Sequence, residues 1–128
     1  MVTKTDIFAC ANIGAPITDM VTGYLGIRGG SGLPRYFMYE EWQSRMGKSL
    51  WEAKDKYLAS SAIVEADKIH TPLLIWHNDK DEAVAYEQGR ALYLAMRRLQ
   101  RPASNLNYKG EGLFLGSQEA QKDWTIRM

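Results

Sequence analysis

The side chains best suited to acid–base chemistry gather directly after the most apolar run of the chain. They are His77, Asp79, Asp81 and Glu82, and Glu111 follows a later short run. An imidazole and a carboxylate can move or orient a proton when they lie within hydrogen-bonding reach. We therefore weigh this part of the chain first as a reaction centre, with His77 interpreted as a packed, hydrogen-bonded residue rather than a base.

No serine stands in the setting of an activated nucleophile. Such a serine lies in a Gly-x-Ser-x-Gly turn between a strand and a helix. Gly29–Leu33 comes nearest, but it lacks the last glycine and follows no predicted strand. The surrounding glycine-rich segment, Gly26–Gly32, also lacks the Gly-Lys-Ser/Thr ending of a phosphate-binding loop, so we interpret it as a structural loop.

The remaining chemical groups indicate structure rather than catalysis. Cys10 is the only cysteine and stands in an apolar run, where we expect a buried, inert thiol. His70 is expected at the surface. No Cys/His spacing suggests a metal site, and no cofactor motif is present. The aromatic residues, Trp42 and Trp51 among them, are expected to lie mainly in the core, with a sugar- or peptide-binding groove as the alternative.

Three strands are needed to position these side chains. We predict them at Ile7–Ala11, Thr71–His77 and Leu106–Tyr108. Between the last two, Tyr86–Gln100 reads as a helix, because its apolar residues recur at helical spacing. Functional loops of open α/β sheets follow the carboxyl ends of the strands. The alternation of strands and helices predicts an α/β fold with about three mainly parallel strands.

The connecting segments carry turn and capping signals. Thr18 to Phe37 is rich in glycine and is predicted to be a loop. Ser49–Glu52 matches a capping box that would start a helix from about Leu50 to about Leu58. Ser60 to Ile69 is predicted to be a turn or short helix, and Ser117 can cap a final helix.

Several of these segments together resemble the prolyl oligopeptidases and dipeptidyl peptidases, family S9 of the serine peptidases. The resemblance rests on Lys68–Val84, the helix after it and Leu106–Glu111, with Gly14–Pro16 and Gly26–Arg28 upstream. It covers nearly the whole chain. The resemblance implies a three-layer, sandwich-like part of an α/β-hydrolase catalytic domain, with peptide substrates and no cofactor.

The resemblance also implies a triad of Ser, Asp and His in that chain order. Asp81 falls at the position of the acid, which holds the histidine in its correct tautomer. The position of the histidine is occupied by Leu113, and the position of the serine would precede Met1. Leucine cannot act as a general base. We therefore expect a vestigial acid and an inactive chain.

Three hypotheses follow from this combination. In the first, the chain is an inactive, truncated or engineered C-terminal fragment of such a peptidase. In the second, it is an interaction module that pairs through the free edge of its first strand, near Ile7–Ala11. That edge could take up a second copy or a complementing hydrolase half. The third hypothesis, an active hydrolase, needs both serine and histidine from a partner.

Composition bounds the remaining possibilities. The chain has 128 residues, 45% of them hydrophobic and 24% charged, and a formal net charge of +1. These values fit one globular domain, residues 1–128, and predict no binding of nucleic acid or anionic membranes. No apolar stretch approaches the roughly 20 residues that span a bilayer. Nothing in the sequence indicates a compartment.

Overall fold

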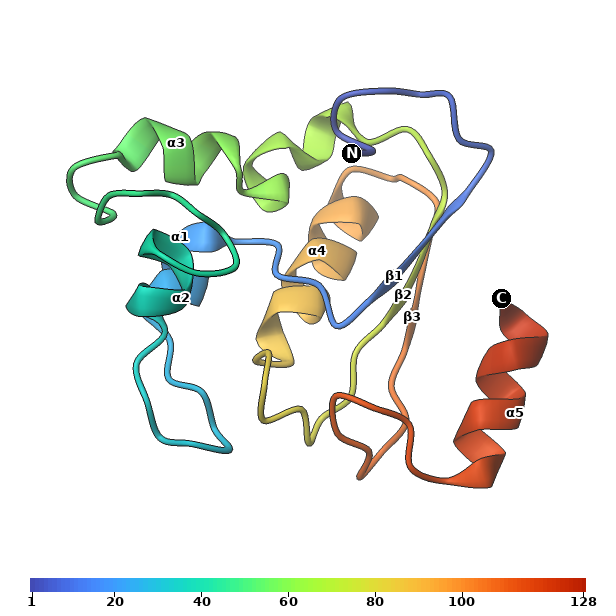
Figure 1. Ribbon diagram of the computed structural model, residues 1–128. Coiled ribbons are helices and arrows are strands. Elements are labelled where there is room, and N and C mark those ends of the chain that lie inside the picture. The colour runs from blue at the N-terminus through green and yellow to red at the C-terminus, as the bar shows by residue number, and fades with distance from the viewer.

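A three-stranded parallel sheet forms the centre of the computed structural model, which describes residues 1–128 (Figure 1). The strands are β1 (Ala11–Gly14), β2 (Leu73–Trp76) and β3 (Ala103–Leu106), and their order in the sheet is β1-β2-β3. Ala11 pairs with Leu73, which pairs with Ala103. Flanking helices complete the predicted α/β fold, which is confirmed.

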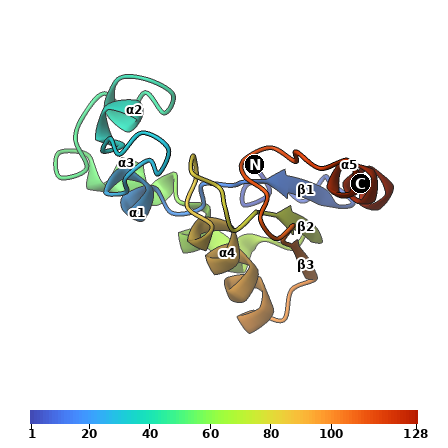
Figure 2. The ribbon, with the colours of Figure 1, turned by 90° about the horizontal axis from the view of Figure 1, so that it is seen from below.

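The central strand is apolar on both faces because helices lie against both. On one face, Leu73 and Ile75 pack against α4 (Glu87–Arg98) and η1 (Ala62–Lys68), where they share a buried cluster with Leu92 and Met96. On the other, the ring of Trp76 lies 5.3 Å from that of Trp124 in α5 (Gln118–Arg127). Figure 2 shows α4 and α5 on opposite sides of the sheet.

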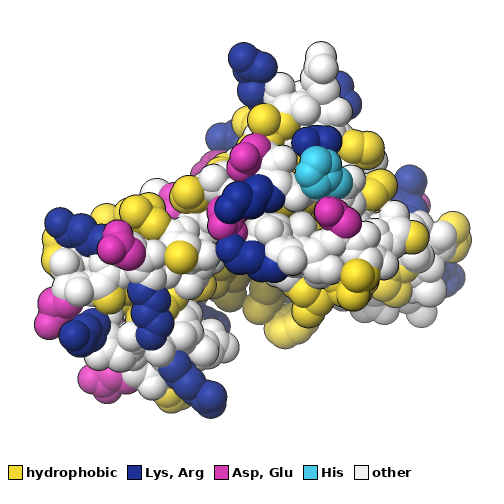
Figure 3. Space-filling model, turned by 90° about the horizontal axis from the view of Figure 1, so that it is seen from above, with side chains coloured by type: hydrophobic (Ala, Val, Ile, Leu, Met, Phe, Trp, Pro, Cys, Tyr) yellow, Lys and Arg dark blue, Asp and Glu magenta, His cyan; other side chains and the backbone are white.

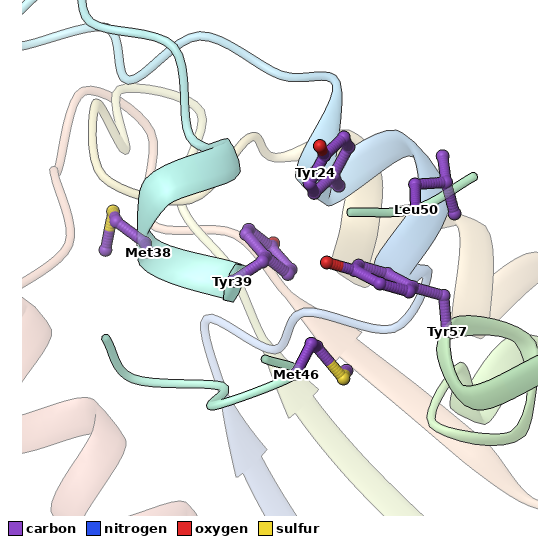
Figure 4. Close-up of a cluster of buried hydrophobic side chains, with 6 residues drawn as sticks. All are labelled: Tyr24, Met38, Tyr39, Met46, Leu50 and Tyr57. Atoms are coloured by element: carbon purple, nitrogen blue, oxygen red, sulfur yellow. The ribbon is translucent and has the colours of Figure 1, made fainter. Parts of the chain in front are cut away.

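Three short helices build a second apolar cluster beside the sheet. They are α1 (Met20–Tyr24), α2 (Tyr36–Glu40) and α3 (Lys54–Ala59). Met46 and Leu50, from the segment between α2 and α3, complete the cluster. Its buried side chains are drawn in Figure 4: Tyr24, Met38, Tyr39, Met46, Leu50 and Tyr57. The cluster is tied to α4 by Thr18 and Gln88, because the amide oxygen of Gln88 accepts hydrogen bonds from the backbone N–H groups of Thr18 and Asp19.

The prediction of the first and third strands was wrong in position. The first strand is Ala11–Gly14, not Ile7–Ala11, and Ile7 is 80% exposed. The third strand is Ala103–Leu106, not Leu106–Tyr108. In both places the ladder with β2 fixes the strand, and the apolar character of the neighbouring residues does not. Cys10, expected to be buried, is exposed for the same reason.

Two helix predictions also need correction. The segment from Thr18 to Phe37 is not a continuous loop, because it contains α1, which Asp19 caps by accepting from the N–H of Val21. The helix expected from Leu50 begins only at Lys54. The carboxylate of Glu52 does reach back to the N–H of Ser49. The Ser49 hydroxyl donates to that same carboxylate, so it caps no backbone N–H group.

Other segments match their predictions closely. The expected helix Tyr86–Gln100 is α4, the segment Ser60–Ile69 contains the 3₁₀ helix η1, and Ser117 caps α5 by accepting from the N–H of Ala120. None of the helices combines the length and the apolar character that crossing a membrane requires. Basic and acidic side chains are interspersed on the face drawn in Figure 3.

Candidate functional site

The carboxylate of Asp81 lies buried at the carboxyl end of β2 and is only half satisfied. Its side chain is fully buried, as is that of His77. Oδ1 accepts hydrogen bonds of 2.8 Å from the backbone N–H groups of both Ala83 and Val84. Oδ2 has no hydrogen-bond donor. A buried carboxylate oxygen without a donor is energetically costly, and Oδ2 can still accept a hydrogen bond.

The nearest imidazole, His77, does not supply that partner. Its Nε2 lies 3.3 Å from Asp81 Oδ2, but it is engaged with the carbonyl oxygen of Val84 at 3.0 Å. The backbone N–H of Gly89 donates to its Nδ1 at 3.2 Å. Because Nδ1 accepts, the hydrogen of a neutral imidazole must be on Nε2. Both ring nitrogens are occupied, and the expectation that His77 is packed and hydrogen-bonded is confirmed.

The close packing of α4 against the His77 ring requires a glycine in that helix. A β-carbon added to Gly89 would lie 2.6 Å from Nδ1 of His77 and 2.9 Å from its Cβ. Sequence reasoning missed this contact. A glycine in the first turn of an otherwise regular helix was the available signal, because glycine is disfavoured there unless another group approaches closely.

The segment that carries Leu113 is held against the acidic loop. The side-chain amide of Asn78, which is buried, donates to the carbonyl of Gly112 at 2.8 Å. Its oxygen accepts from the N–H of Tyr108. The N–H of Lys80 donates to the carbonyl of Glu111. These contacts hold the loop that contains Asp81 against the turn that precedes Leu113, although Asn78 had not been singled out from the sequence.

Glu111 orders the far side of the same segment. Its two carboxylate oxygens accept from the backbone N–H groups of Gly116 and Ser117. Hydrogen bonding from Ser117 and Gly116 lowers the pKa of Glu111 below its ordinary value. Glu111 therefore braces the turn between β3 and α5, and its oxygens are not free for catalysis.

The other residues weighed from the sequence lie at the surface. Asp79 is exposed and accepts from the N–H of Gly110, Glu82 is exposed, and His70 is exposed as expected. The glycine-rich loop packs on the acidic loop, since the N–H of Gly30 donates to the carbonyl of Glu82. This contact supports its interpretation as a structural loop. No three His, Cys, Asp or Glu side chains are grouped so that they could hold a metal ion.

Comparisons with known proteins agree with one another. The model of the prolyl oligopeptidase family matches residues 1–128. A probable dipeptidyl-peptidase 5 of Aspergillus clavatus is 29% identical over 91 residues, which are 70% of this chain and 12% of that protein. A puromycin hydrolase mutant complexed with PGG has a TM-score of 0.79 at 21% identity, covering 96% of this chain and 18% of the other.

A second solved relative has the same fold at similar distance. The acylaminoacyl peptidase of Pyrococcus horikoshii, uncomplexed, has a TM-score of 0.77 at 18% identity. The match covers 99% of this chain and 20% of that peptidase. The chain thus spans a fifth or less of the length of these relatives, and the structural likeness concerns the fold of that part.

Proposed function

Because the chain belongs to the prolyl oligopeptidase family, we propose that it is the acid-bearing part of a serine-peptidase catalytic unit and has no activity of its own. Asp81 takes the place of the triad acid in this proposal. The parent unit hydrolyses peptide bonds, and this chain contributes the carboxylate that would orient a histidine. A fragment of altered or engineered origin fits the same proposal.

One observation carries the proposal, the unpartnered Oδ2 of Asp81. Two backbone N–H groups fix the carboxylate through Oδ1 and leave the second oxygen buried without a donor. A carboxylate retained for stability alone would have its lone pairs satisfied. An acid that orients an imidazole needs one oxygen free to accept from that ring.

Two other positions support the proposed lack of activity. Leu113 follows the Gly110–Gly112 turn, whose contacts with Asn78 and Lys80 place it beside the acidic loop. Its side chain can neither accept nor donate a proton. No serine of the chain stands in a Gly-x-Ser-x-Gly turn. Without a base and an activated nucleophile, acyl transfer cannot begin.

Activity and covalent labelling test the proposal directly. The purified chain should neither hydrolyse a p-nitrophenyl ester or a prolyl peptide nor react with a fluorophosphonate probe. Leu113→His should not restore turnover, because the nucleophile is still missing. Fluorophosphonate labelling of any serine in this chain, with contaminating enzymes excluded, contradicts the proposal.

A titration tests whether the carboxylate of Asp81 faces the side chain at position 113. An imidazole introduced by Leu113→His should donate to Oδ2, and the neighbouring negative charge should raise its pKa. NMR titration should therefore give a higher pKa for this imidazole in Leu113→His than in the double variant Leu113→His/Asp81→Asn. Equal values in the two proteins would show that Asp81 does not face this position.

A second candidate function, association through β1, is favoured by the open edge of the sheet. Ala11 donates its N–H group to Pro72, directly before β2, and Ala15 donates to Trp76 in β2. The alternation along the strand therefore directs the backbone groups of Asn12 and Gly14 away from β2. A largely apolar groove of about 490 Å³, lined in part by Phe8 and Ile13, runs beside this edge. We propose that a second copy of this chain pairs there, because a strand edge is self-complementary across a two-fold axis.

Sedimentation measurements separate this pairing from a monomer. Asn12→Pro removes one outward N–H group without touching the bonds to β2, and should lower the dimer fraction, whereas Asn12→Ala should not. A strictly monomeric chain at every concentration contradicts self-pairing. Co-elution with a complementing hydrolase half, but not with itself, would assign the edge to that partner instead.

A further inference from the structure

A recess between α1 and α2 is lined by aromatic rings and one carboxylate. Its volume is about 480 Å³, within the range of small-molecule sites. It lies outside the acid site and the β1 edge. The lining residues are Tyr24, Leu25, Pro34, Tyr36, Glu40 and Trp51. We refer to it as the aromatic recess.

Three aromatic side chains meet in this recess. The ring of Tyr24 lies 5.9 Å from that of Trp51, edge to face, and 6.3 Å from that of Tyr36. Tyr24, which belongs to the buried cluster of Figure 4, is the most deeply buried of the three rings. Tyr36 is 49% exposed and Trp51 is 65% exposed. Such exposure departs from the sequence expectation that Trp51 is a core residue, and it leaves ring surface open to a ligand.

The carboxylate of Glu40 gives the recess its charge. Oε1 accepts a hydrogen bond of 2.6 Å from the hydroxyl of Tyr24. Glu40 forms no salt bridge with any lysine or arginine of the chain. Burial, followed by the hydrogen bond to Glu40, raises the pKa of Tyr24 to about 12. The recess therefore combines an uncompensated negative charge with aromatic surface.

We propose that the aromatic recess binds a small organic cation of the alkylammonium class. Aromatic faces attract such cations through the quadrupole of the ring, and a carboxylate adds direct charge attraction. A neutral apolar ligand would gain nothing from Glu40, and an anion would be repelled by it.

The test uses tetramethylammonium chloride and a neutral molecule of similar shape, tert-butanol. Indole N–H signals are followed by ¹H–¹⁵N NMR at constant ionic strength, and the Trp51 signal is assigned by its loss in Trp51→Phe. The cation should shift this signal saturably, whereas tert-butanol should not. Equal responses to both molecules, or no response to the cation, overturn the proposal.

Matched variants separate the recess from the rest of the surface. Glu40→Gln keeps an acceptor for Tyr24 but removes the charge, and should weaken binding of the cation about tenfold. Glu41→Gln, which changes a neighbouring exposed carboxylate outside the recess, should have no effect. Trp51→Ala should abolish binding, and Trp42→Ala, at a residue 66% exposed and outside the recess, should not. Equal affinities of wild type and Glu40→Gln contradict the assignment.

Discussion

At the scale of single residues, the structure separates a buried titratable group whose hydrogen bonds are complete from one whose hydrogen bonds are not. His77 has both ring nitrogens occupied, by Val84 and by Gly89. Asp81 has one oxygen fully used and the other left without a donor. The two side chains are close together and equally buried, but they differ in whether their hydrogen bonds are complete. That difference cannot be predicted from the sequence, because the partners are set by the fold.

Gly89→Ala should destabilise the protein through His77. The added β-carbon would lie 2.6 Å from a ring nitrogen that is fully buried and cannot swing away. Overpacking of this kind costs about 1–3 kcal/mol, and the better helix propensity of alanine offsets roughly 1 of that. We therefore expect the free energy of unfolding in urea to fall by up to about 2 kcal/mol.

Gly112→Ala is the control for this substitution. The nearest atom to its added β-carbon is the carbonyl oxygen of Lys80 at 3.5 Å, an ordinary contact. Its stability should stay within about 0.5 kcal/mol of wild type. If Gly89→Ala proves as stable as Gly112→Ala, or more so, the close packing of α4 on His77 is not what fixes the imidazole.

At the scale of elements, the sequence predicted which segments are strands and helices better than where they start. β2 is found where four large apolar residues follow one another, because both of its faces are covered. β3 contains Ser104 and Asn105 in its middle, so its polarity concealed it. Ile7 and Phe8 have a strand composition but lie outside the ladder. Pairing with β2 decided these boundaries, and pairing is not visible in a single sequence.

The site shows the same division between local and non-local information. The placement of Asp81 directly after β2, and of Leu113 after a glycine turn, could be predicted from motif order along the chain. The bracing of these two loops by Asn78 could not, because it joins residues 30 and 34 positions apart. The prediction of helix capping was correct at Ser117, where the hydroxyl accepts from one backbone N–H group. It was wrong at Ser49, where the hydroxyl donates to a carboxylate instead.

The final helix, α5, should depend on one aromatic contact. Among its residues only Ala120 is buried, and its Trp124 ring packs on Trp76 of β2 at 5.3 Å. Trp124→Ala should lower the free energy of local opening of α5 by about 1 kcal/mol or more, which corresponds to about fivefold faster amide exchange. Hydrogen exchange measured by NMR should show this change in α5 while α4 stays protected.

Ile126→Ala provides the comparison within the same helix. Ile126 is 84% exposed, so its truncation removes little packing and should leave exchange in α5 nearly unchanged. Similar acceleration in both variants would show that helix propensity, rather than the Trp76–Trp124 contact, holds α5 on the sheet.

At the scale of the whole molecule, several ion pairs and carboxylate hydrogen bonds join distant segments. Glu65 in η1 binds Lys4 near the start of the chain as well as Lys68. Asp123 in α5 accepts from the hydroxyl of Tyr108, in the loop after β3. These carboxylates act only when they are ionised, so the cohesion of the molecule depends on pH.

Acid should therefore loosen the molecule in a defined window. Hydrogen bonds from Lys4 and Lys68 lower the pKa of Glu65 from 4.5 to about 2, and those from Arg127 and Tyr108 lower the pKa of Asp123. A carboxylate with a lowered pKa in the folded state stabilises it fully above its ordinary pKa, and this stabilisation is lost as pH falls. Urea midpoints should decrease as the pH falls from about 4.5 toward 2.

Glu65→Gln should flatten this decrease, whereas Glu41→Gln, at an exposed residue outside any ion pair, should leave it unchanged. An equally steep decrease in Glu65→Gln would show that the contacts of Lys4 and Lys68 with Glu65 do not contribute to acid stability.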